Sequence, residues 1–135
     1  MTDTPGGTHA VVVGGSMAGL LGARVLADYF DRVTLVERDQ FPTGPQFRAG
    51  VPQSRHIHVL LVKGLQVLER LFPGFRADLV GAGAITVRWP ADVLWLSPVG
   101  WGRRFPEGLE LLSASRELFE WTTRRRLRTP RQPVD

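Results

Sequence analysis

The sequence predicts an α/β fold that opens with a βαβ unit of two parallel strands. A run of β-branched residues at 10–13 ends in the pair Gly14-Gly15, and a small-residue segment with helical apolar spacing follows. A second buried strand, "RVTLVE" at 32–37, completes the unit in fewer than thirty residues. A connection this short implies parallel strands with a right-handed crossover. With 135 residues, the chain fits one domain.

The elements of this unit follow from local patterns. From Ser16 to about Phe30, apolar residues recur on one helical face, which predicts a helix there. Gly19 and Gly22 keep this helix thin, so it can lie close to a sheet. Residues 39–55 are expected to form a loop because they contain Pro42, Gly44, Pro45 and Gly50.

The rest of the sequence, from residue 57 onward, is predicted to form helices and short strands. Apolar residues at helical spacing predict an amphipathic helix over 57–72, which Pro73-Gly74 ends. We expect a short helix at 75–80 and a final helix that begins at Ser113 or Ser115 and runs to about Arg128. Short strands are expected at 84–89, 93–97 and 108–113, a flexible start at 1–8 and a coil at 129–135.

Composition excludes several classes of function. The chain has no cysteine, so disulfides and thiolate chemistry are excluded. The absence of cysteine is compatible with a reducing cytoplasm. The net charge of +4 arises entirely from arginines beyond residue 123, without a base-reading face, so no nucleic-acid partner is expected. The sequence has no uninterrupted run of about 18 apolar residues, so no membrane-spanning helix is predicted.

The glycine turn has the spacing of a dinucleotide-binding site. Gly14 takes the position of the tight turn and Gly19 the position where helix packs on strand, whereas Ser16 replaces the usual middle glycine. The serine hydroxyl is expected to donate to a phosphate oxygen. Backbone N–H groups where the helix begins would receive the phosphates. The candidate cofactor-binding residues of the turn are Gly14, Gly15, Ser16, Met17, Ala18 and Gly19.

Glu37 ends the second strand of the unit, 23 positions after Gly14. A carboxylate there can accept hydrogen bonds from both hydroxyls of an adenosine ribose, and it would repel a 2′-phosphate. The fold is therefore predicted to be Rossmann-like and to bind FAD or NAD rather than NADP. The alternative is a glycine-rich turn in an unrelated α/β protein.

Two stretches favour FAD over NAD by resemblance. The opening "VVVGGSMAGLLGARVLADYFDRVTLVERD" and the stretch "GVPQSRHIH" resemble FAD-dependent monooxygenases of the para-hydroxybenzoate hydroxylase type, in particular an actinobacterial branch. The similarity runs from about His9 to Arg128. It implies a cytoplasmic flavoprotein oxidoreductase, with residues 1–135 as its N-terminal FAD- or NAD(P)-binding segment.

The resemblance also implies roles for individual residues. Arg38 would lie beside the adenine or pyrophosphate, and Arg48 and Arg116 would reach toward FAD, although both arginines would otherwise be ordinary surface residues. His56 and His58 would lie near the flavin pocket or serve in packing. Residues two apart point to different sides of a helix, so this pair predicts no metal site. No catalytic residue is identified.

The function implied by the resemblance is hydroxylation or epoxidation of a small organic substrate, with NAD(P)H as the reductant. The family carries an Asp-Gly and a Gly-Asp motif beyond the position of residue 135, so the segment is expected to be incomplete by itself. A missing C-terminal half or a second chain would supply the rest. The alternative is a truncated, non-catalytic nucleotide-binding remnant or a partner-dependent module. An NAD-binding enzyme domain is disfavoured by the "RAGVPQSRHIH" stretch.

Overall fold

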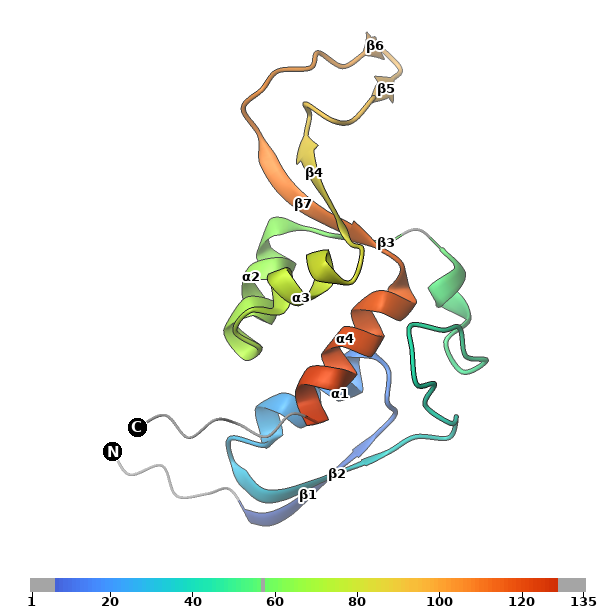
Figure 1. The fold of residues 1–135 in the computed structure, drawn as a ribbon, viewed down its shortest axis with the longest axis vertical. Coiled ribbons are helices and arrows are strands. Elements are labelled where there is room, and N and C mark those ends of the chain that lie inside the picture. Colours follow the sequence, from blue (N-terminus) through green and yellow to red (C-terminus); the bar gives the residue numbers. More distant parts are fainter. Residues whose placement is uncertain (1–6, 57, 129–135) are drawn as a thin grey trace, which may run out of the picture. The chain divides into compact units, whose positions relative to one another are not determined.

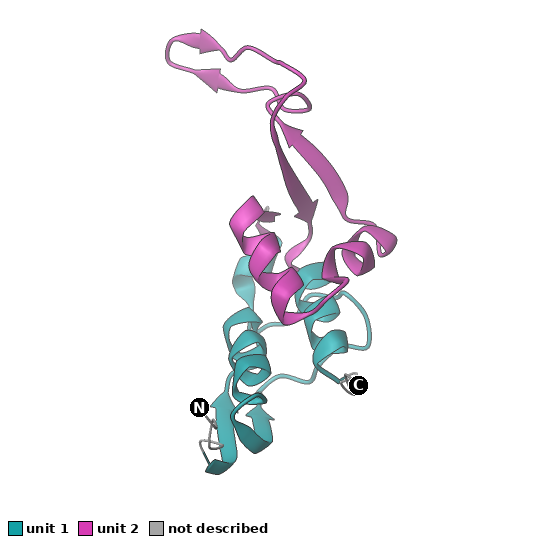
Figure 2. Ribbon diagram, turned by 90° about the vertical axis from the view of Figure 1, so that its left-hand side faces the viewer, with its two compact units in different colours: residues 1–55, 117–135 teal, residues 56–116 magenta. Residues whose placement is uncertain are grey.

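The computed structural model describes residues 7–56 and 58–128, and these form a mixed α/β structure of two compact units. The first unit comprises the described residues of 1–55 and 117–135, and the second comprises those of 56–116 (Figure 2). Each unit contains helices and a sheet. The predicted α/β class is therefore confirmed, and the chain enters the second unit and returns to complete the first.

The first unit begins with the expected strand–helix–strand order: β1 (Gly7–Val13), α1 (Met17–Leu26) and β2 (Phe30–Val36), drawn in blue to cyan in Figure 1. β1 and β2 are parallel, with register from Gly7↔Phe30 to Val13↔Val36. Several boundaries differ from prediction, and β2 itself spans 30–36 rather than 32–37. The helix ends four residues early because β2 already begins at Phe30, and residues 7–8 belong to β1 rather than to a flexible start.

Close packing of α1 on the strand pair depends on Gly19. A Cβ at this position would overlap the carbonyl oxygen of Gly14 and touch Val12. Leu20 and Ala23 of the same helix are buried. The helix therefore approaches the turn through backbone atoms, as the sequence spacing predicted.

The first unit is completed by a 3₁₀ turn at Pro52–Arg55 and by α4 (Arg116–Arg128), of which Arg116 is assigned to the second unit. The predicted final helix is confirmed. Trp121 Nε1 donates to the Thr43 carbonyl at 2.9 Å, which ties α4 to the loop after β2. The expected coil at 129–135 and the remainder of the expected flexible start, 1–6, lie outside the described residues.

The second unit is a three-stranded antiparallel sheet with two helices. Its sheet has the order β3 (His58–Leu60), β7 (Leu109–Ala114), β4 (Ile85–Trp89). Its helices are α2 (Val62–Leu71) and α3 (Phe75–Gly81), and α2 contacts both α3 and β7. Its buried apolar side chains are Leu65, Leu68, Phe72, Phe75, Leu79, Ala84 and Leu112.

The helix predicted over 57–72 is wrong in its first turn. Residues 58–60 pair with β7, from His58↔Ala114 to Leu60↔Leu112, so their backbone groups belong to the sheet. The helix begins only at Val62, where Leu65 N–H bonds to the Leu61 carbonyl at 3.0 Å. Apolar spacing alone did not distinguish the two because Leu60 and Leu61 suit either structure.

β4 and β7 continue into a projecting segment that ends in the short pair β5 (Leu96–Ser97) and β6 (Gly100–Trp101). β5 covers only two residues of the predicted strand at 93–97. Trp95 and Trp101 remain 55% and 67% exposed.

Two kinds of feature are absent from residues 7–56 and 58–128. No helix there combines the length and apolar character needed to cross a bilayer. No group of three or more His, Asp or Glu side chains there is arranged to hold a metal ion.

Candidate functional site

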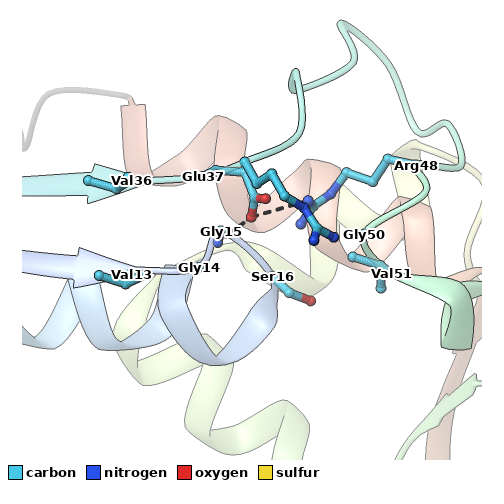
Figure 3. A pocket seen from close by; sticks show the side chains of 10 residues that line it. Val13, Gly14, Gly15, Ser16, Val36, Glu37, Arg48, Gly50 and Val51 are labelled. Carbon is cyan, nitrogen blue, oxygen red and sulfur yellow. Dashed lines mark hydrogen bonds and ion pairs between the residues drawn. The ribbon is translucent and has the colours of Figure 1, made fainter.

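A cavity of about 430 Å³ lies where β1 and β2 end, entirely within the first unit (Figure 3). Its size is within the range of small-molecule sites. Ligands of open parallel sheets bind beyond the carboxyl ends of the strands, which is where this cavity lies. It is lined by Val13, Gly14, Gly15, Ser16, Val36, Glu37, Arg38, Arg48, Gly50 and Val51.

The glycine turn forms one wall. Gly14 has φ +98°, a conformation that side-chain-bearing residues rarely adopt, and its N–H donates to the Val36 carbonyl at 2.8 Å. Gly15 is packed so closely that a Cβ would collide with Phe41 and the Glu37 carboxylate. Ser16 is the N-cap residue of α1, yet its side chain makes no capping hydrogen bond to the helix. The first amides of α1 therefore have no side-chain cap from Ser16.

Glu37 forms the opposite wall, directly after β2. Its carboxylate accepts the Gly15 N–H at 2.5 Å and the Asp39 N–H at 3.0 Å, and Arg48 Nη1 lies 3.2 Å from Oε2 (Figure 3). The Asp39 N–H contributes most to lowering the pKa of Glu37 to about 2, with Gly15 and Arg48 adding to it against the opposing effect of burial. Glu37 is therefore ionised at neutral pH.

The contacts of Glu37 leave limited room for a ligand. A carboxylate offers about four lone-pair sites, two on each oxygen. Oε2 already accepts from Gly15 and Arg48, whereas Oε1 accepts from Asp39 alone within the described part of the chain. Glu37 thus retains capacity on Oε1 for one further donor, fewer than the two ribose hydroxyls expected from sequence.

Arg48 lies at the centre of a cluster of acidic side chains. Its side chain is 6% exposed, and Nε donates to Glu120 Oε1 at 2.8 Å while Nη1 donates to Asp39 Oδ2 at 3.2 Å. Its buried Nη2 has no hydrogen-bond partner in the part of the chain that the structure describes. Burial opposes the charge, but the carboxylates of Glu120 and Glu37 outweigh it and raise the pKa of Arg48. The surface-arginine alternative is therefore wrong for this residue.

Two further members of the cluster come from α4 and were missed by sequence reasoning. Glu120 accepts from Ser16 Oγ at 3.1 Å as well as from Arg48. Arg124 donates to the Pro42 carbonyl at 2.6 Å and lies over the Phe41 ring, 4.8 Å from its centre. Burial lowers the pKa of the Arg124 guanidinium. The sequence feature that could have revealed this cluster was Glu120, a carboxylate on the apolar face of an arginine-rich helix.

The remaining predicted residues lie in different places. Arg38 lines the cavity with a side chain that is 84% exposed. His56 and His58 belong to the second unit, where His58 Nδ1 donates to the His56 carbonyl at 2.8 Å. Arg116, the first residue of α4, is assigned to the second unit as well. Within one unit, the structure brings together the glycine turn, Glu37, Arg38 and Arg48; His56, His58 and Arg116 belong to the other unit.

The chain is similar in sequence to a much longer mycobacterial protein. Protein Rv3254 of Mycobacterium tuberculosis is 42% identical over 123 residues, which make up 88% of this chain and 26% of that protein. The chain therefore spans about a quarter of the length of this relative. The chain matches no protein-family model.

Proposed function

We propose that the first unit binds the adenosine diphosphate portion of FAD, and that the chain acts as the FAD-binding segment of a flavin-dependent monooxygenase. One observation carries the proposal. A glycine turn that opens a helix, an ionised carboxylate at the end of the neighbouring parallel strand and a buried arginine with an unused donor all border a single cavity. An adenosine diphosphate offers ribose hydroxyl groups to the carboxylate and anionic oxygens to the glycine turn and the arginine.

The chemistry of the donors fits this ligand. Glu37 Oε1 would accept one ribose hydroxyl, and the ionised carboxylate would repel a nucleotide that carries a 2′-phosphate. The uncapped first amides of α1 and Arg48 Nη2 would bind the diphosphate. Arg38 is exposed at the rim, where it would lie beside adenine or diphosphate.

The flavin end of the proposal rests on the family resemblance. FAD, reduced by NAD(P)H, supplies the oxygen-transfer chemistry of such enzymes, and the protein orients and shields it. Contacts of His56, His58 and Arg116 with the flavin are proposed from the resemblance alone, for the complete enzyme. Because Protein Rv3254 is much longer than this chain, hydroxylation or epoxidation and its organic substrate are proposed for a complete enzyme to which this segment would contribute.

Calorimetric titration of the 135-residue chain with ADP, FAD and NADP⁺ tests the proposal. We expect saturable binding of ADP and FAD, and weaker binding of NADP⁺. Glu37→Gln should reduce ADP affinity about tenfold, because a hydrogen bond to a charged group contributes roughly 1.5–3 kcal/mol. Glu107→Gln, an exposed acid of the second unit, is the matched control.

The outcomes separate the alternatives. A folded chain, verified by circular dichroism, that binds no ADP would refute the proposal. Binding of NADP⁺ as tight as that of FAD would refute the role of Glu37. Equal affinity for ADP and FAD would favour the non-catalytic nucleotide-binding module, since the flavin half would then contribute nothing.

A further inference from the structure

Glu120 connects the glycine turn to Arg48, both of which line the cavity, without lining it itself. Oε2 accepts the Ser16 hydroxyl of the glycine turn at 3.1 Å, and Oε1 accepts Arg48 Nε at 2.8 Å. Its side chain is 7% exposed, and Arg124 Nη1 lies 3.7 Å from Oε1. A single carboxylate from α4 thus contacts two segments that are separated in sequence and that border the same cavity.

This arrangement assigns the Ser16 hydroxyl a role different from the one its sequence position suggests. A hydroxyl has one proton to donate, and Ser16 donates it to Glu120. The expectation that the hydroxyl donates to a phosphate oxygen is therefore replaced, in this structure, by an anchor between turn and helix. The same interaction explains why the N-cap side chain makes no bond to its own helix.

The contact to Arg48 has an equally specific effect. Nε is held by Glu120 and Nη1 by Asp39 and Glu37, so the planar guanidinium is fixed on two edges. Its remaining nitrogen, Nη2, is the one without a partner among the described residues. Because Arg48 lines the cavity, these contacts fix the orientation of its guanidinium there before a ligand arrives.

We propose that Glu120 is a positioning residue for the nucleotide cavity, which fixes the glycine turn through Ser16 and the guanidinium that lines the cavity through Arg48. The inference rests on the proposed function for the identity of the ligand. It assigns to Glu120 no contact with that ligand. Loss of the carboxylate should loosen the glycine turn and the segment around Arg48 together, even with no nucleotide present.

The experiment compares the full parent chain with Glu120→Gln, using amide hydrogen exchange without ligand and calorimetric titration with ADP. Glu120→Gln keeps the side-chain size and removes the charge. We expect at least tenfold faster exchange in both 14–19 and 48–51, and about tenfold weaker ADP binding. Glu117→Gln, a partly exposed acid in the first turn of the same helix, should change neither quantity.

A double-mutant cycle distinguishes positioning from general destabilisation. If Glu120 acts through Ser16, the loss of ADP affinity in Ser16→Ala and in Glu120→Gln should overlap, so that the double variant loses less than the product of the two fold-changes. A purely structural effect would leave the two losses multiplicative. That multiplicative result would overturn the proposal.

The two proposals fail in different ways. If the parent binds no ADP while Glu120→Gln still accelerates exchange in both segments, the nucleotide function is refuted and the connection made by Glu120 stands. If exchange is unchanged in either segment, or if the parent binds ADP and Glu120→Gln binds it equally well, the positioning role is refuted, and ADP binding by the parent alone decides the nucleotide function.

Discussion

Replacing Arg48 by methionine should destabilise the first unit strongly. The guanidinium contacts three carboxylates, those of Glu37, Asp39 and Glu120, whose side chains are 11%, 16% and 7% exposed. Methionine keeps much of the apolar stem and leaves these negative charges without their shared partner. Breaking a buried ion pair by removing one partner costs roughly 3–5 kcal/mol, and solvent in the cavity places the expected loss near the lower end, at about 3 kcal/mol.

Urea denaturation followed by far-ultraviolet circular dichroism measures this loss as a decrease in the free energy of unfolding. Arg38→Met is the matched control, because its side chain is 84% exposed and lies 3.8 Å from Asp39, and it should change stability by less than about 0.5 kcal/mol. Arg48→Lys keeps the charge but lacks the planar guanidinium that contacts several carboxylates at once. Its loss of unfolding free energy should therefore lie between those of Arg48→Met and Arg38→Met. A loss below about 1 kcal/mol in Arg48→Met would mean that the cluster behaves like a solvated surface pair, and the reasoning would be refuted.

Three other predictions concern stability. Because the folded state lowers the Glu37 pKa from 4.5 to about 2, its contribution is fully present above pH 4.5 and lost as the pH falls toward 2. Solvent screening limits this contribution to about 1–2 kcal/mol. In Glu37→Gln the free energy of unfolding should therefore fall less steeply as the pH is lowered below 4.5. An equally steep fall in the parent and the variant would contradict this prediction. Gly19→Ala should lower the melting temperature, because the new Cβ would overlap the Gly14 carbonyl, whereas Gly22→Ala, with open space around it, should raise stability by up to about 1 kcal/mol; the same sign for both variants in thermal melts would argue against the close packing of α1. Leu112→Ala, at a fully buried position of β7, should cost about 2–5 kcal/mol by urea denaturation, and a cost under 1 kcal/mol would show that the second unit is loosely packed.

The parts of the fold that the sequence predicted well depend on short-range patterns. The βαβ order, the role of Gly19 and the final helix follow from periodicity and turn residues within a few positions of each other. The segment at 58–60 was assigned wrongly because its pairing partner, β7, lies about fifty positions later. An apolar pattern shows which residues are to be buried, but it does not show what covers them.

The candidate site divides in the same way. Gly14, Glu37 and Arg48 were found because the motif and the resemblance fix their positions, and the structure places them around one cavity. Glu120 was missed because its relation to Ser16 and Arg48 spans 104 and 72 residues and obeys no spacing rule. The deep burial of Arg48 likewise depends on α4, which sequence reasoning did not connect to the loop at 39–55.

The return of α4 to the first unit has a consequence for the order of folding. β1, α1 and β2 can associate early, but Glu120 reaches Ser16 only after a loop of 104 residues closes. Apart from a constant term, loop-closure entropy for that separation is about 4 kcal/mol, against roughly 3 kcal/mol for the 22 positions between Gly15 and Glu37. The turn and its acid are thus assembled locally, whereas the anchoring of both depends on α4, which leaves the ribosome after them. Nucleotide capture would then report that synthesis has passed α4.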